Sequence, residues 1–313
     1  MKDELLMLKL FPTFVSLSNF NQLMKKKTLL LFSLFLSLSA IHAQLLWKVT
    51  GNGLKHPSYL FGTHHLISIQ FLDSVPGLFK AFNECDAVVG EMVINNIDAT
   101  AKIQQAAIMP DHQKIKDLLN DEEYKLVDNE LKSVLKFGLK DVSIMNPTLI
   151  LTMYEMEIYK KLTGFSDDKQ IDSYFQTVAN AKGKKVIGLE SIDQQIAVLF
   201  GTGTLERQAD ILVNTIERKD KILTEMIQLN KLYKEGKIDE LVELSKGKDN
   251  ITDMTEEEYA KLVDNRNFDW LAKLPGYFKE TSCFVAVGAM HLGGKNGLVK
   301  QLQKAGYKVV GSK

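Results

Sequence analysis

Two stretches of the sequence decide the fold, Tyr59-Leu-Phe-Gly-Thr-His-His-Leu66 and Val285-Ala-Val-Gly-Ala-Met-His-Leu292. Each is an apolar run typical of a buried strand, followed by Gly-x-x-His-Leu. Glycine lets the chain turn tightly where a strand ends, and the histidine then points into the crevice where open α/β sheets bind ligands. The repetition therefore predicts that His65 and His291 converge on one site.

Three more apolar runs extend the predicted sheet, and they lie at residues 86–94, 184–189 and 307–310. Between the strands, residues 98–181 and 204–274 carry apolar side chains at helical spacing. This order favours an α/β fold with a mixed central sheet and a large helical insertion or cap. Within the second block we expect one long amphipathic helix over 205–233 and a capping box at Thr255-Glu-Glu-Glu258.

The composition excludes several classes of protein. The 313 residues are 45% hydrophobic and contain no low-complexity linker, so residues 44–313 are expected to form a single domain. Basic and acidic residues both number 39, which is not the basic excess of a nucleic-acid-binding protein. Two cysteines exclude a disulfide-rich scaffold and a four-cysteine zinc site. The motifs of zincins, phosphate-loop proteins and serine hydrolases are absent.

Residues 24–43 have the three parts of a secretory signal, namely lysines, an apolar stretch of about ten residues and a small-residue exit. Residues 1–23 are then an upstream extension before a true start at Met24. Cleavage after Ala43 leaves Gln44 first, although Ile41 is larger than the residue usually found three positions before such a site. We expect an exported protein, periplasmic or extracellular, with no transmembrane span once the signal is removed; an uncleaved membrane anchor is the alternative.

Removal of the signal changes the charge of the chain. Residues 1–43 hold five lysines and two acidic residues, so residues 44–313 have 34 basic and 37 acidic residues and a net charge of −3. In an oxidising compartment Cys85 and Cys283, each just before a predicted strand, can form a disulfide or remain two buried thiols.

Acidic residues accompany two other predicted strands. Glu91 lies near the end of an apolar strand, where an ionised side chain is costly unless paired, and Glu190 directly follows the next strand. Two histidines with one or two carboxylates are a typical set of ligands for a divalent metal. Such a metal generates hydroxide near neutral pH, and a spare carboxylate serves as general base. Glu190 has an alternative role as the cap of the following helix.

Two further residues stand near this predicted site. Arg266 can fix a site carboxylate or a substrate carbonyl by a bidentate contact, with a surface salt bridge as the alternative. His64 points away from His65 in an extended chain, so we expect a structural role for it.

These residues carry a resemblance to the TraB/GumN family, which spans about residues 45–310. The matching segments are Leu46-Trp47, Tyr59–His65, Val88–Glu91, Gly188–Ser191 with Gln194 and Gln195, Asn265–Asn267, Phe284–Leu292, Gly297-Leu298 and Gly306–Val309. The family includes the Tiki proteins, membrane-tethered metalloproteases that depend on Mn²⁺ or Co²⁺. Its related fold includes erythromycin-esterase-like enzymes and a haem-binding lipoprotein.

The resemblance implies roles for single residues. His65 and His291 match the family's essential histidines, Glu91 and Glu190 its acidic positions, and Arg266 its Arg-Asn motif. It implies a divalent metal, Mn²⁺ or Co²⁺ with Zn²⁺ as an alternative, bound by His65, His291 and Glu91. Glu91, Glu190 and Arg266 are then the expected catalytic residues.

Two classes of function follow. The first is an exported metal-dependent hydrolase, foremost a peptidase, with a peptide or protein as substrate. The second is a non-catalytic envelope protein that binds a peptide or haem through the same histidines. Family membership does not fix the substrate, because one fold hosts many functions.

Overall fold

The computed structural model describes residues 44–94, 97–166, 171–247 and 251–312. Ala43–Lys313 forms one compact unit. The predicted signal peptide and upstream extension lie outside the described residues. Within the described ranges, no helix is long and apolar enough to cross a membrane.

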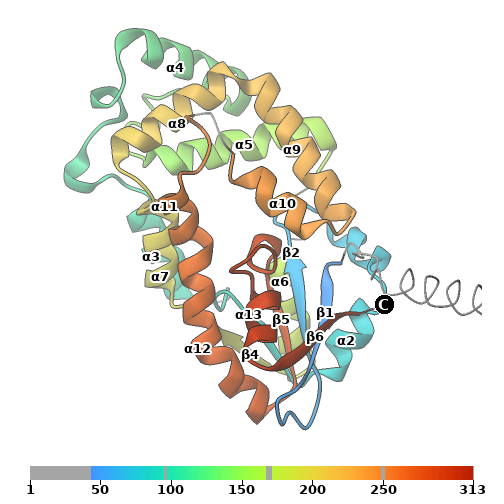
Figure 1. The fold of residues 1–313 in the computed structure, drawn as a ribbon. Coiled ribbons are helices and arrows are strands. Elements are labelled where there is room, and N and C mark those ends of the chain that lie inside the picture. The colour runs from blue at the N-terminus through green and yellow to red at the C-terminus, as the bar shows by residue number, and fades with distance from the viewer. Residues whose placement is uncertain (1–43, 95–96, 167–170, 248–250, 313) are drawn as a thin grey trace, which may run out of the picture. The chain divides into compact units, whose positions relative to one another are not determined.

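The centre of the fold is a six-stranded mixed sheet in the order β4-β3-β5-β2-β1-β6 (Figure 1). The strands are β1 (Leu46–Gly51), β2 (Ser58–Thr63), β3 (Ala87–Gly90), β4 (Lys185–Gly188), β5 (Cys283–Gly288) and β6 (Tyr307–Gly311). β4, β3, β5 and β2 are parallel to one another, whereas β1 runs antiparallel to β2 and to β6. The chain therefore has the predicted α/β fold with a mixed central sheet.

Helices surround this sheet and also form a separate layer. They are α2 (Leu78–Glu84), α3 (Ile97–Ala106), α4 (Asp121–Leu135), α5 (Pro147–Thr163), α6 (Ile171–Ala181), α7 (Ile192–Phe200), α8 (Leu205–Glu217), α9 (Lys219–Lys234), α10 (Ile238–Ser245), α11 (Glu256–Tyr259), α12 (Asn265–Glu280) and α13 (Leu298–Lys304). Short 3₁₀ turns are η1 (Ile69–Ser74), η2 (Pro110–His112), η3 (Ile115–Asp117) and η5 (Ala289–His291), and η4 (Ala260–Asp264) is a π-helical stretch.

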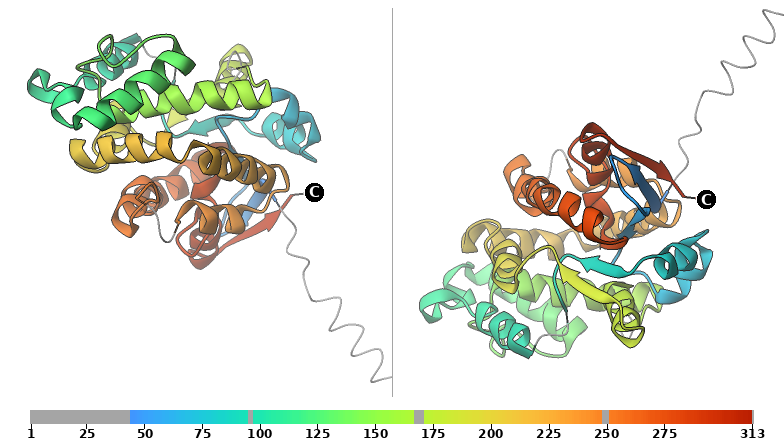
Figure 2. Two further views of the ribbon diagram at one scale, coloured as in Figure 1. Left: turned by 90° about the horizontal axis from the view of Figure 1, so that it is seen from above. Right: turned by 90° about the horizontal axis from the view of Figure 1, so that it is seen from below.

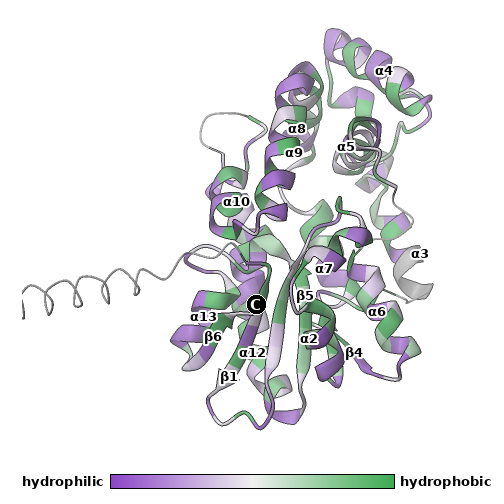
Figure 3. Cartoon of the chain, turned by 90° about the vertical axis from the view of Figure 1, so that its right-hand side faces the viewer, coloured by the Kyte–Doolittle hydropathy of each residue, from purple (hydrophilic) through white to green (hydrophobic). Residues whose placement is uncertain are grey.

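Two apolar clusters divide the packing. The larger one contains the strands with residues of α2, α6, α12 and α13, and Figure 3 shows the hydrophobic colouring of the strands. The smaller one lies among α4, α5 and α8, which contact one another beyond the carboxyl end of β2 (Figure 1). Figure 2 shows these helices as a layer beside the sheet. These three helices form the helical cap. The ranges expected for the cap also include residues of α6 and α12, but these two helices pack in the core of the sheet.

The five predicted strands are all present, with shifted ends, and three elements differ from expectation. β1 was not predicted as a strand; it alternates only weakly and pairs on both sides, with β2 and β6. The prediction of one long helix over 205–233 is wrong. The helix is interrupted at Arg218, which has φ −110° and ψ 23° and separates α8 from α9. The expected capping box at Thr255 is confirmed, but the helix it begins is interrupted by the π-helical stretch.

Cys85 and Cys283 are both free and buried, so the disulfide alternative is not what the structure shows. Burial raises the pKa of each thiol to about 12. Both side chains are therefore neutral core residues at physiological pH.

The glycines of the two Gly-x-x-His segments serve close packing. Neither Gly62 nor Gly288 has a positive φ, so the expected need for a special backbone turn does not apply. A Cβ on Gly62 would lie 3.0 Å from Cα of Ala289 and 3.2 Å from Cδ1 of Leu292. A Cβ on Gly288 would lie 3.3 Å from Oε1 of Glu91. The missing side chains let the loop after β5 approach β2 and let Glu91 approach the backbone.

Gly62→Ala is expected to lower the free energy of unfolding by about 1–3 kcal/mol, because the added methyl overpacks a buried contact. Gly276→Ala is the matched control: it lies inside α12, nothing is within 4 Å of its Cβ position, and alanine is favoured over glycine in a helix by about 0.5–1 kcal/mol. Urea unfolding of both variants measures the difference. Equal stability of the two variants contradicts the packing explanation.

Candidate functional site

Four adjacent parallel strands bring the predicted site residues to one edge of the sheet. Because β4, β3, β5 and β2 are parallel neighbours, their carboxyl ends lie together. Glu190 lies two residues beyond β4, and Glu91 directly follows β3. His291 lies three residues beyond β5, and His65 lies two beyond β2. Both histidines thus lie just beyond the ends of neighbouring parallel strands, β2 and β5.

Arg266 connects three of these four residues. Its Nε donates to Oε1 of Glu190 at 2.7 Å, and its Nη2 donates to Oε2 of Glu91 at 2.6 Å and to Oε2 of Glu190 at 3.0 Å. Its Nη1 donates to the carbonyl of Leu262 at 3.0 Å and lies 3.2 Å from Nε2 of His291. All five N–H groups of the guanidinium thus have a partner within the protein. Arg266 fixes the two carboxylates, and its side chain is only 10% exposed.

A π-helical stretch, Ala260–Asp264, directly precedes α12 and supplies the Leu262 carbonyl that Nη1 of Arg266 contacts. A π-helical turn inserts an extra residue into a helix, and such turns are frequent at functional sites. The helix that follows buries Arg266, Asn267 and Trp270. The Trp270 ring lies 4.9 Å from the guanidinium carbon and 4.3 Å from the His291 ring, so it covers both groups.

The side-chain oxygens of Glu190 accept hydrogen bonds from three residues. Besides Arg266, Nε1 of Trp270 donates to its Oε1 at 2.8 Å and Nε2 of Gln195 donates to its Oε2 at 2.7 Å. Its side chain is 4% exposed. The sequence also allowed Glu190 to cap the following helix, but the residue that caps α7 is Ser191, through its hydroxyl. Glu190 holds Arg266 in place and offers no open lone pair to a substrate.

Glu91 is the more accessible carboxylate, with 20% of its side chain exposed. The N–H of Gly288 donates to its Oε1 at 2.9 Å. Burial raises the pKa of Glu91, but the positive charges of His291 and Arg266 and this N–H outweigh it and bring the pKa to about 2. Glu91 is therefore ionised at every physiological pH.

His291 is a buried, neutral ring. Burial lowers its pKa to about 4, so Arg266 carries the positive charge that faces Glu91 at neutral pH. Nδ1 of His291 lies 2.8 Å from Oδ1 of Asn267, whose amide nitrogen donates to the carbonyls of His291 and Asn296. Nδ1 then carries the proton, and the lone pair of Nε2 faces the guanidinium.

His65 contacts a partner that lies outside the Arg266 network. Its Nδ1 lies 2.9 Å from Oδ2 of Asp172 in α6, and Oγ1 of Thr63 donates to the other oxygen of Asp172 at 2.6 Å. The hydrogen-bonding contact with Asp172 raises the pKa of His65 to about 9, and the charge of Glu91 adds to the rise. The His65 side chain is 67% exposed, which leaves Nε2 open.

His64 makes contacts that differ from those of His65. Its Nδ1 accepts the N–H of Leu66 at 3.0 Å, and its ring packs edge-on against Tyr233 at 5.1 Å. The Tyr233 hydroxyl donates to the carbonyl of Gly62 at 2.9 Å. These contacts hold the loop that carries His65.

The residues present do not fit a metal bound jointly by His65, His291 and Glu91. Nε2 of His291, the atom that would bind it, faces Arg266, and the same guanidinium holds Oε2 of Glu91. A guanidinium at this position repels a divalent cation. Across the described ranges, no group of three or more His, Cys, Asp and Glu side chains is arranged to hold a metal ion. The metal stays a prediction.

The sequence reasoning missed Asp172 and Trp270. Asp172 lies in the first turn of a helix whose neighbours Ile171 and Phe175 are buried, and an acidic residue beside such a face was its only signal. Trp270 lies four residues after Arg266, on the same face of α12. The positions of Asp172 and Trp270 in the sequence do not indicate their partners, because each contacts residues that lie far away along the chain.

The fold and the site define an α/β protein with a charged site at the carboxyl ends of its parallel strands. The chain belongs to the TraB/PrgY/gumN family, whose family model matches residues 45–310, and the predicted resemblance is confirmed. Comparison with curated proteins and with solved structures gave no match.

Proposed function

We propose that the protein hydrolyses peptide bonds at this edge of the sheet, with His65 as general base. One observation carries the proposal: the exposed imidazole of His65 is held through Nδ1 by Asp172 at 2.9 Å, beside the buried network of Arg266. Above a pH of about 9, where His65 becomes neutral, an aspartate that fixes one imidazole nitrogen leaves the other free to take a proton, as in the Ser-His-Asp hydrolases.

The reaction follows from this geometry. Nε2 of His65 takes a proton from water as the water oxygen attacks the carbonyl carbon of the peptide. When the C–N bond breaks, the imidazolium gives that proton to the leaving nitrogen, and the products are a carboxylate and an amine. Glu91, ionised and partly exposed, accepts a hydrogen bond from a substrate N–H. Arg266 and Glu190 are positioning residues that keep Glu91 and His291 fixed.

The metal-dependent version of this hydrolase rests on the family resemblance. Because the described side chains do not fit the predicted ligand set, no step above uses a metal. The alternative is a non-catalytic protein whose same histidines bind a peptide or haem. Its support is limited to the histidine contacts described above.

We also propose that the protein is exported, on the strength of the signal-like residues 24–43. N-terminal sequencing of protein recovered outside the cytoplasm is expected to begin at Gln44. A first residue of Met1 or Met24 contradicts cleavage.

A digest of a synthetic peptide library, read by mass spectrometry, tests the hydrolase. The wild-type mature chain is expected to cleave peptides in the presence of a chelator, and His65→Gln is expected not to. Activity that a chelator abolishes and that Mn²⁺ or Co²⁺ restores contradicts the metal-free route and supports the metal-dependent one. An intact library under every condition, with a haem Soret band that depends on His65 or His291, supports the binding protein instead.

A further inference from the structure

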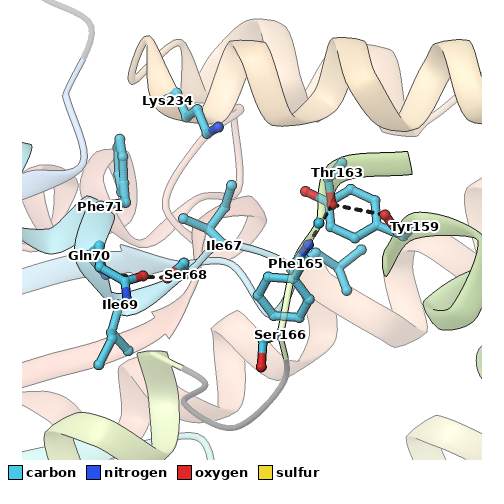
Figure 4. Close-up of a pocket in the computed structure, with 12 residues that line it drawn as sticks. Ile67, Ser68, Ile69, Gln70, Phe71, Tyr159, Thr163, Phe165, Ser166 and Lys234 are labelled. Carbon is cyan, nitrogen blue, oxygen red and sulfur yellow. Dashed lines mark hydrogen bonds between the residues drawn. The ribbon is translucent and has the colours of Figure 1, made fainter. Parts of the chain in front are cut away.

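A pocket opens directly beside the loop that carries His65. It has a volume of about 690 Å³, within the range of small-molecule sites. Its walls come from Leu66–Phe71 after β2, from the end of α5 with the turn that follows it, and from Lys234 at the end of α9 (Figure 4). Leu66, the first residue of the wall, is the next residue after His65.

Most of the pocket wall is apolar or uncharged. Its apolar members are Leu66, Ile67, Ile69, Phe71, Tyr159 and Phe165. Figure 4 shows Phe71 on one side and Phe165 with Tyr159 on the other. The rings of Tyr159 and Phe165 lie 5.8 Å apart, and the turn between them is tied by the Thr163 hydroxyl, which bonds the carbonyl of Tyr159 at 2.8 Å and the N–H of Phe165 at 3.2 Å. Contacts within the protein therefore hold the wall that faces Phe71 in place.

Lys234 is the one charged residue among the described residues that line the pocket. In Figure 4 its Nζ points over the space between Phe71 and Thr163. Lys234 is exposed, and its charge helps to lower the pKa of His64. Since the preceding residue, Tyr233, packs on both His64 and Phe71, the same turn of α9 links the lysine to the histidine loop.

We propose that this pocket takes the C-terminal residue of a peptide when that residue is apolar and ends in a free carboxylate. The apolar wall binds the side chain, and Lys234 binds the carboxylate as a point charge. The peptide bond before that residue then lies beside His65. The inference rests on the proposed peptidase, and it assigns the substrate class as peptides with an apolar C-terminal residue.

Binding rather than cleavage tests the assignment. The affinity for N-acetyl-Gly-Leu-Phe is measured by calorimetry in the mature His65→Gln variant, which the proposed function expects not to cleave peptides. The peptide is used once with a free C-terminal acid and once with a C-terminal amide, while mass spectrometry checks that it stays intact. We expect the acid to bind at least about tenfold more tightly than the amide, and the preference to shrink at high salt as the charge is screened. Equal affinities for acid and amide overturn the proposal.

Two variants separate the lysine from its surroundings. Lys234→Gln is expected to remove the preference for the acid, whereas Lys231→Gln, one turn earlier on α9 and paired with Glu235, is expected to keep it. A preference that survives in Lys234→Gln overturns the role of the lysine. Phe165→Ala is expected to weaken both peptide forms several-fold, and unchanged affinity overturns the role of the wall.

A final arm uses dodecanoate, which carries the same carboxylate on an apolar chain. Binding of dodecanoate that depends on Lys234, without binding of the peptide acid, overturns the peptide assignment in favour of a lipid carboxylate. None of these readouts needs turnover. A library that stays intact therefore refutes the hydrolase while the preference for the peptide acid still tests the pocket.

Discussion

Replacing Arg266 with methionine is expected to lower the free energy of unfolding by about 3–5 kcal/mol. The guanidinium is the shared partner of Glu91 and Glu190, at 2.6 and 2.7 Å. Its loss leaves two carboxylates without their cation in a largely buried position, which costs more than the pair contributes when it is complete. Urea unfolding at neutral pH measures the change.

Two comparisons show whether the loss comes from the buried charges. Lys102→Met breaks the exposed pair with Asp193 at 2.7 Å and is expected to cost less than about 1 kcal/mol. The double variant Arg266→Met with Glu190→Gln is expected to recover part of the stability, because one uncompensated charge is removed. A loss in Arg266→Met as small as that in Lys102→Met contradicts the proposed role of the network.

The same network is expected to make the stability of the fold depend on pH in the acid range. The folded pKa of Glu91, about 2, lies below its ordinary value of 4.5. Its contribution to stability is therefore fully present above about pH 4.5 and is lost as the pH falls toward 2. In Arg266→Met this part of the acid sensitivity is expected to shrink but not to vanish, because Arg266 is gone while His291 and the Gly288 N–H still lower the pKa of Glu91.

His65→Gln is expected to lower kcat/KM for peptide cleavage by about 10²–10⁴-fold, the usual contribution of a general base. Urea unfolding of the variant is measured beside the activity, because the substitution also removes the contact with Asp172. The control is His56→Gln, an exposed histidine in the loop between β1 and β2, which is expected to keep full activity. Equal losses in both variants contradict a specific role for His65.

Much of the site follows from local sequence patterns. Gly62 and Gly288 each precede a histidine by three residues at the end of an apolar run, and parallel strands place such ends side by side. Glu91 was expected to need a partner because it follows apolar residues, and Arg266 is that partner. These inferences hold because a buried charge must be compensated wherever the chain brings its partner from.

What the sequence does not show is which partner each group selects. His65 lies on Asp172 of α6, and His291 lies on Arg266 of α12, so the two histidines belong to two neighbouring arrangements. Their spacing from glycine is the same, but the elements packed over the strand ends decide the contacts. The sequence pattern also did not indicate the break at Arg218 or the π-helical stretch before α12, because helical spacing continues through both.

The dependence of kcat/KM on pH tests the role of His65 most directly. Because His65 must lose its proton to act as base, the wild-type rate is expected to rise about tenfold per pH unit and to level off near pH 9. In Asp172→Asn, which removes the carboxylate that raises this pKa, the plateau is expected to begin at a lower pH. A wild-type profile that is flat from pH 6 to about 9, or a plateau that Asp172→Asn leaves in place, would contradict the assignment of His65 as general base.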